Sequence, residues 1–166
     1  KIKGALLLTF PSATGIVWLK PAGALSQTLA WTGTGNVNPV KLQYSTNNGS
    51  TWTDIVTLAA ASLATNGDGA QSYTWNPVAD VKTEQAKVKV LHDNASFSEV
   101  VDESDNAFAI RPQLTVSAPT GGADLVVGTS SHDVTITRTS ATLTNVKLEY
   151  SKDGGTWTLL AAGSDN

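Results

Sequence analysis

The sequence predicts an all-β protein made of two consecutive β-sandwich units, of which the second is incomplete. Apolar and polar residues alternate over many short segments, and turn-forming residues separate these segments roughly every 8–12 residues. An internal repeat then indicates that there are two units. With 166 residues, of which 40% are hydrophobic, the chain has enough apolar side chains to bury a core.

The strands of the first unit follow from this alternation. The apolar run after Gly4 predicts the first strand, because it is short for a secretory signal and Pro11 follows without a cleavage site. Further strands are predicted at residues 16–19, 29–31, 40–44, 73–75, 86–91 and 108–110. Residues 53–65 favour helix by composition, but they lack a cap. They are therefore expected to form a strand that runs into a loop, with room for one helical turn.

The repeat is the most specific feature of the chain. The segment 40–53 (VKLQYSTNNGSTWT) returns at 146–158 (VKLEYSKDGGTWT), about 105 residues later. Weaker matches pair Leu29 and Trp31 with Val134 and Ile136, and residues 9–11 with 117–119. Each copy of the long match predicts a hairpin with Asn-Gly or Asp-Gly in its turn, where Tyr and Trp can meet across the strands. Four tryptophans are expected to pack in the cores: Trp31, Trp52, Trp75 and Trp157.

The repeat divides the chain at residues 1–111 and 112–166. The second unit holds roughly the first half of a sandwich and has no counterpart of the last three strands of the first unit. Half a sandwich exposes its core face, so two explanations stand open. Either the chain is a piece of a longer protein that continues, which we favour, or other chains supply the missing strands by β-addition.

Several segments resemble the immunoglobulin-like and fibronectin-type-III-like modules strung along large prokaryotic cell-surface proteins. They are the repeated hairpin, YTWNP at 73–77, AKVKV at 86–90 and SDNAFAI at 104–110. Such modules occur in S-layer proteins, adhesins and stalks, and as spacers in secreted hydrolases. The resemblance implies tandem immunoglobulin-like β-sandwiches that serve structure and spacing, with no catalytic residues to carry over. The sequence departs from the pattern where Pro21, Ala22 and Gly23 are inserted.

The composition argues against an enzyme. The chain has no cysteine or methionine and only two histidines, His92 and His132, which are expected at the surface or at strand ends. No nucleophile–base motif or phosphate-binding glycine loop is present in the sequence. A net charge of −3 gives no basic footprint for nucleic acid, and no apolar run has the length of a membrane span.

One acidic stretch is a candidate metal site. Asp93, Asp102, Glu103 and Asp105, with Glu99 among them, lie close together in the sequence without a basic residue between them. Calcium prefers such oxygen ligands, so these four carboxylates are the candidate calcium ligands. No cofactor is otherwise required, and the alternative is a solvated loop that keeps a sheet edge soluble.

Two further kinds of site are predicted. Asn48 and Asn94 begin Asn-x-Ser patterns in expected loops and are candidate glycosylation sites. Ile16 and Trp18 lie in a run that is apolar on both faces, which indicates either a buried strand or an interface to a neighbouring subunit or domain.

Together these observations predict a non-catalytic structural module of a large secreted or surface-exposed prokaryotic protein. It would provide rigid spacing and lateral self-assembly, as in an S-layer-like lattice or a surface filament. The expected partners are copies of itself or neighbouring domains of the same long chain. The alternative is a carbohydrate-binding or adhesive accessory module of a secreted enzyme, in which exposed tryptophan or tyrosine rings could stack on surface glycans, a binding that Trp18→Ala would test.

Overall fold

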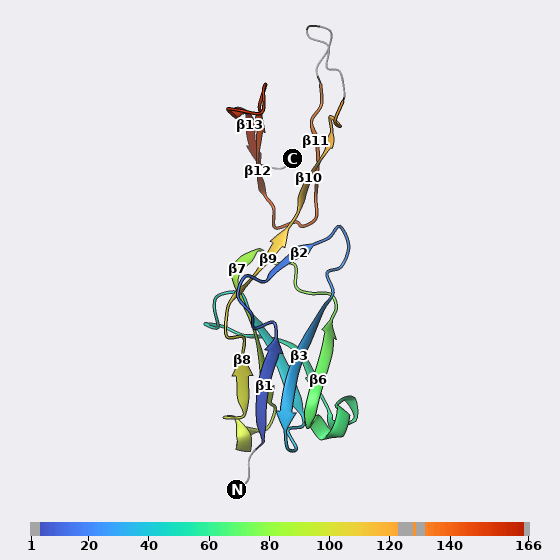
Figure 1. The fold of residues 1–166 in the computed structure, drawn as a ribbon, viewed down its shortest axis with the longest axis vertical. Coiled ribbons are helices and arrows are strands. Elements are labelled where there is room, and N and C mark those ends of the chain that lie inside the picture. The colour runs from blue at the N-terminus through green and yellow to red at the C-terminus, as the bar shows by residue number, and fades with distance from the viewer. Residues whose placement is uncertain (1–3, 123–127, 129–131, 165–166) are drawn as a thin grey trace.

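The computed structural model describes residues 4–122, 128 and 132–164, and it confirms that the chain is all-β (Figure 1). The first unit contains β1 (Ala5–Phe10), β2 (Val17–Lys20), β3 (Gln27–Thr34), β4 (Val40–Ser45), β5 (Thr53–Leu58), β6 (Gly69–Trp75), β7 (Thr83–His92), β8 (Val101–Glu103) and β9 (Phe108–Pro112). The second unit contains β10 (Leu114–Ala118), β11 (Thr135–Arg138), β12 (Asn145–Tyr150) and β13 (Thr158–Ser164).

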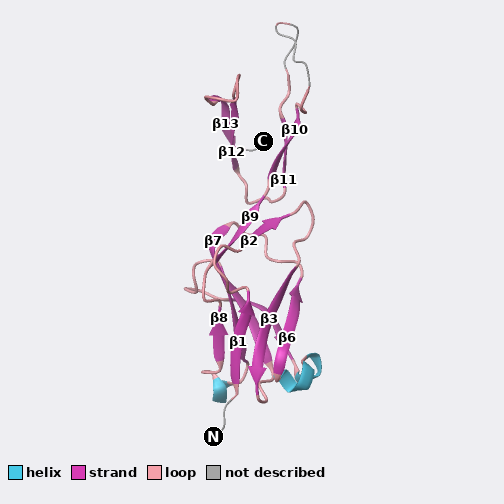
Figure 2. Ribbon diagram, in the orientation of Figure 1, coloured by secondary structure: helices cyan, strands magenta, loops and turns pink. Residues whose placement is uncertain are grey.

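Helical structure among the described residues is limited to short 3₁₀ turns, drawn in cyan in Figure 2. They are η1 (Ala60–Ser62), η2 (Ala64–Gly67) and η3 (Ala95–Phe97). The first two follow β5 directly, so the helix-favouring composition of this segment yields single turns after a strand, as predicted.

Two sheets form the first unit. One has the order β1-β3-β6 and is antiparallel, and the other has the order β2-β9-β7-β4-β5, with β8 on β7. In the second sheet β2 runs parallel to β9, while the other pairs are antiparallel. Buried residues from both sheets make one hydrophobic cluster, which is the arrangement of a β-sandwich.

The core consists of the inward residues of each alternating strand. Leu29, Leu42, Val88 and Val90 are fully buried, and their polar neighbours in sequence face outward. At the end of β7, His92 is also buried, where Nε2 lies 3.0 Å from the carbonyl oxygen of Asn38. Of the two positions expected for His92, the surface or a strand end, the structure shows the strand end, with the side chain buried.

Trp18 belongs to this core, so of the two alternatives for its segment the structure shows the buried strand. Its side chain is 3% exposed, and its ring centroid lies 4.3 Å from that of Phe108. The register of β2 on β9 places Trp18 beside the buried Ile110, so Trp18 turns inward and its neighbours Val17 and Leu19 turn outward. Trp18 therefore offers no exposed ring to a glycan.

Two tryptophans that were expected in the cores lie elsewhere. Trp52 is half-buried beneath the ammonium group of Lys89, whose Nζ lies 4.1 Å from the centre of the indole ring. Trp157, its counterpart in the repeat, is 63% exposed. Tyr44 packs against Trp75, with ring centroids 5.0 Å apart, so the expected stacking partner across its own hairpin is replaced by a residue of the other sheet.

The second unit consists of two hairpins that repeat the pairings of the first. β10 pairs with β11 as β1 pairs with β3, and β12 pairs with β13 as β4 pairs with β5, all antiparallel. The irregularities also coincide, because the register shifts between Leu148 and Glu149 as it does between Leu42 and Gln43. The sequence repeat therefore corresponds to a repeat of strand pairings and of their β-bulge.

A single residue, Gln113, connects the last strand of the first unit to the first strand of the second. Its amide donates to Thr139 Oγ1 at 2.7 Å, and its carbonyl oxygen accepts from the amide of Thr139 at 3.1 Å. Next to it, Ser140 Oγ donates to Asp80 Oδ1 at 2.6 Å across the junction. The connection is short and hydrogen-bonded on both sides.

Candidate functional site

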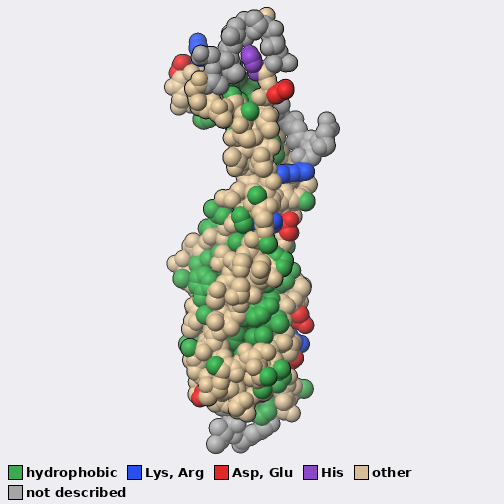
Figure 3. Space-filling model, turned by 90° about the vertical axis from the view of Figure 1, so that its right-hand side faces the viewer, with side chains coloured by type: hydrophobic (Ala, Val, Ile, Leu, Met, Phe, Trp, Pro, Cys, Tyr) green, Lys and Arg blue, Asp and Glu red, His purple; other side chains and the backbone are tan. Residues whose placement is uncertain are grey.

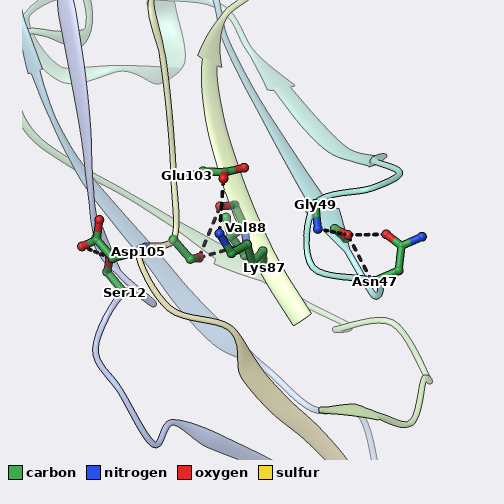
Figure 4. Close-up of polar contacts among 9 residues, drawn as sticks. Ser12, Asn47, Gly49, Lys87, Val88, Glu103 and Asp105 are labelled. Atoms are coloured by element: carbon green, nitrogen blue, oxygen red, sulfur yellow. Dashed lines mark hydrogen bonds and ion pairs between the residues drawn. The ribbon is translucent and has the colours of Figure 1, made fainter. Parts of the chain in front are cut away.

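The acidic stretch does not assemble into one group. Asp102 accepts the amide of Leu8 at 2.7 Å, and Glu103 forms an ion pair with Lys87 at 3.2 Å. Figure 4 shows the Glu103 pair and a separate bond from Ser12 Oγ to Asp105.

Asp93 directly follows β7, and its Oδ1 lies 3.1 Å from Nζ of Lys41 in β4. This hydrogen bond raises the pKa of Lys41. In the part of the chain that the structure describes, no three acidic or histidine side chains converge on one point. Within β8, Asp102 and Glu103 face opposite sides, because successive residues of a strand do so.

Both predicted glycosylation sites are exposed. Asn48 occupies the hairpin turn with a φ of 54°, followed by Gly49 at 86°, as expected for an Asn-Gly turn. The side chain of Asn94 accepts the amide of Ser96 at 2.9 Å and so caps η3. Modification of these two asparagines stays a prediction.

Ile16, the second predicted interface residue, is half-buried and packs against the core of the first unit. Its carbonyl oxygen accepts the amide of Ala109 at 3.0 Å, which fixes the start of β2 beside β9. The outward residues Val17 and Leu19 leave an apolar strip at this edge.

The most distinctive surface of the molecule is the inner face of the second unit. Val116, Val134, Leu148, Tyr150 and Leu160 line a pocket of about 270 Å³ between its two hairpins. Val116 is 59% exposed and Val134 is 39% exposed. The matching residues of the first unit, Leu8 and Leu29, are 2% and 0% exposed. We call this surface the open face.

The open face is bordered by two strands with an unpaired edge. Among the described strands, β11 pairs with β10 and β12 pairs with β13, and neither has a second neighbour. In the first unit the matching edges carry β6 and β7. Backbone amides and carbonyls on such an edge are free to pair with an added strand.

A charged pair lies on β12 itself, and one of its members, Glu149, also borders the pocket. Lys147 Nζ contacts Glu149 Oε1 at 2.6 Å, and the exposed ring of Trp157 belongs to the same hairpin. The site therefore combines an apolar surface, a free strand edge and two opposite charges. These are groups that bind a polypeptide strand, and the described residues of this face include no acid–base pair with a nucleophile.

The missing strands of the repeat predict the open face, whereas the contact between Lys89 and Trp52 was not predicted from the sequence. The signal that could have found it is the outward position of Lys89 in the alternation of β7, next to the outward side of the repeated hairpin.

No protein-family model and no curated protein sequence matches the chain. None of the described helices has the length and apolar character needed to cross a membrane.

Proposed function

We propose that this chain is a non-catalytic structural module of a large secreted or surface-exposed prokaryotic protein. It holds neighbouring parts at a fixed spacing and assembles laterally with copies of itself or with neighbouring domains, as in an S-layer-like lattice or a surface filament. Catalysis plays no part in this proposal.

The observation that carries the proposal is the junction between the units. The chain enters the first unit at one end of the long axis and leaves it at the other, where β9 continues into β10 across Gln113 (Figure 1). The bond between Ser140 and Asp80 restrains rotation at this point. A module with opposite entry and exit points and a short connection transmits length along a chain.

The strand order supports the resemblance to immunoglobulin-like modules. A three-stranded sheet faces a larger one, and the N-terminal segment crosses from the first sheet in β1 to the second in β2, beside the last strand β9. In the space-filling view, the first unit is a filled body and the chain narrows above it (Figure 3). This shape suits a spacer better than a cleft-bearing enzyme.

A distance measurement tests the spacing. The chain has no cysteine, so the exposed pair Thr74→Cys and Thr137→Cys can be spin-labelled specifically. We expect one narrow distance distribution by double electron–electron resonance. A matched variant with about four glycines inserted after Gln113 should broaden it, because the linker becomes flexible. A broad distribution in the unmodified junction would contradict rigid spacing.

Electron microscopy tests the lateral assembly. Concentrated protein should form ordered sheets or filaments, since the exposed strand edges and apolar residues offer repeated contacts. A monodisperse monomer at every concentration would contradict this part of the proposal.

A further inference from the structure

In the first unit, β7 shows what covers the edge that is open in the second. β7 pairs antiparallel with β4, so that Leu42 lies opposite Val90, Gln43 opposite Lys89, and Tyr44 opposite Val88. Val88 and Val90 are fully buried and fill the space beside Leu42. β12 repeats β4 in sequence and in its pairing with the following strand, so the same register defines which residues a strand on its free edge would meet.

The outward side of this strand pair carries two charge contacts. Lys89 lies over the ring of Trp52, and burial there lowers the pKa of the lysine. Just beyond β7, Asp93 forms an ion pair with Lys41 of β4. A strand of the β7 type thus brings one basic group to the hairpin tryptophan and one acidic group to the lysine of the acceptor strand.

The second unit keeps the acceptor half of both contacts. Trp157 takes the place of Trp52, and Lys147 takes the place of Lys41. At the position of Gln43 the repeat has Glu149, which adds a negative charge where the incoming lysine would lie. Lys147 and Glu149 pair with each other in this structure. Each would gain a new partner from a strand with a lysine at one position and an aspartate four residues later.

The inner side fits the same strand. Two apolar residues separated by one position, as Val88 and Val90 are, would point into the pocket between the hairpins and cover Leu148 and Tyr150. At about 25 cal/mol for each Å² of apolar surface removed from water, covering such exposed side chains favours strand addition.

We propose that the free edge of β12 is an acceptor site for an antiparallel β-strand with the chemistry of β7. That strand has alternating valine-like residues on one side, a lysine that contacts Glu149 and Trp157, and an acidic residue that contacts Lys147. This inference rests on the assembly part of the proposed function and names the partner by its sequence pattern.

Tethered strand capture tests the inference on the full chain. A copy of residues 83–94 is appended after Asn166 through a Gly/Ser linker of about 15 residues, whose mean reach of about 20 Å spans the length of β12. Hydrogen exchange of the β12 amides, followed by NMR, reports capture. We expect exchange to slow by about tenfold or more relative to the unmodified chain, and the emission of Trp157 to shift to the blue.

Charge reversal tests the register. Glu149→Lys should abolish most of the slowing, because it places a lysine opposite the lysine of the appended copy. Lys89→Glu made only in that copy, combined with Glu149→Lys, should restore it. Gln43→Lys at the matching, half-buried position of the first unit is the control and should leave β12 exchange unchanged. A scrambled copy should give no slowing.

Three results would overturn the inference. They are unchanged β12 exchange with the native copy, slowing that survives charge reversal, and concentration-dependent slowing in the chain without a copy. The last result would assign the edge to a second copy of this chain. None of these outcomes alters the distance between the two units, so the spacer proposal and the acceptor proposal can fail separately.

Discussion

The two units share four strands and their pairings, yet only one of them has a closed core. Leu42 is fully buried in the first unit, whereas its counterpart Leu148 lines an open pocket in the second. The difference lies in β6, β7 and β9, which have no counterparts among the described strands of the second unit.

This comparison separates local from long-range contributions to the fold. Each hairpin forms its turn and its bulge in both units, so these features depend on nearby sequence. Burial of the apolar side depends on strands that come later in the chain and pair across the sheet. The repeated hairpins are thus one half of a sandwich, and strands of the β6 and β7 type are the other.

The largest expected effect comes from truncating one leucine in each unit. Leu42→Ala removes a fully buried side chain and should lower the free energy of unfolding by about 2–5 kcal/mol. Leu148→Ala should cost less than about 1 kcal/mol, because that side chain is only half-buried. Urea denaturation followed by tryptophan fluorescence measures both. Equal losses would show that the second unit has a closed core in solution.

The two hairpin tryptophans provide a smaller effect. Trp52→Ala removes the ring beneath Lys89 and should cost about 1–2 kcal/mol, while Trp157→Ala should be nearly neutral. In the Trp52 variant the pKa of Lys89 should rise toward its ordinary value, because burial of the ammonium group is relieved. NMR titration of the lysine side chain checks this shift. An unchanged pKa would mean that the indole does not bury Lys89.

The junction provides a third test, with little effect on stability. Ser140→Ala removes the bond to Asp80 and should broaden the spin-label distance distribution between the units, while the unfolding midpoint of the first unit stays unchanged. Thr137→Ala, made in the chain that carries no spin labels, is a surface control and should leave the unfolding midpoint unchanged. A distribution as narrow as that of the parent would show that Gln113 alone fixes the angle.

The smallest expected effect is a pH dependence in a strand pair that is confined to the first unit. Arg111 contacts Glu84 through two hydrogen bonds of 2.8 and 2.7 Å and lowers the pKa of this carboxyl below 4.5. The stabilisation is therefore present above pH 4.5 and is lost as the pH falls through the lowered value. The urea midpoint should fall slightly less between neutral and acidic pH in the Glu84→Gln variant than in the unmodified chain. An identical pH dependence would mean that the pair contributes nothing.

Much of the fold was predictable because it follows from local patterns. Alternation located the main strands, and Asn48-Gly49 located the hairpin turn. The sequence left Trp18 open between a buried strand and an interface, because its place depends on the pairing of β2 with β9 far along the chain. The arrangement of the acidic stretch was not predictable from proximity in sequence either. Strand alternation and separate partners keep its carboxylates apart.

The candidate site was predictable in outline only. Counting strands in the repeat indicated an exposed core face, and the structure shows that face as a pocket between two hairpins. The role assigned to Trp157 needed the first unit as a template, because only the packing of Lys89 on Trp52 shows what such a ring contacts.

Hydrogen exchange of β4 and β12 in the unmodified chain tests most directly that the later strands close the sandwich. Each of the two strands pairs with the strand that follows it in the sequence, β5 or β13, but only β4 is paired on both edges. We predict that the slowest β4 amides exchange at least about a thousandfold more slowly than any β12 amide, because they open only with the whole unit. Equal protection of the two strands would contradict the account.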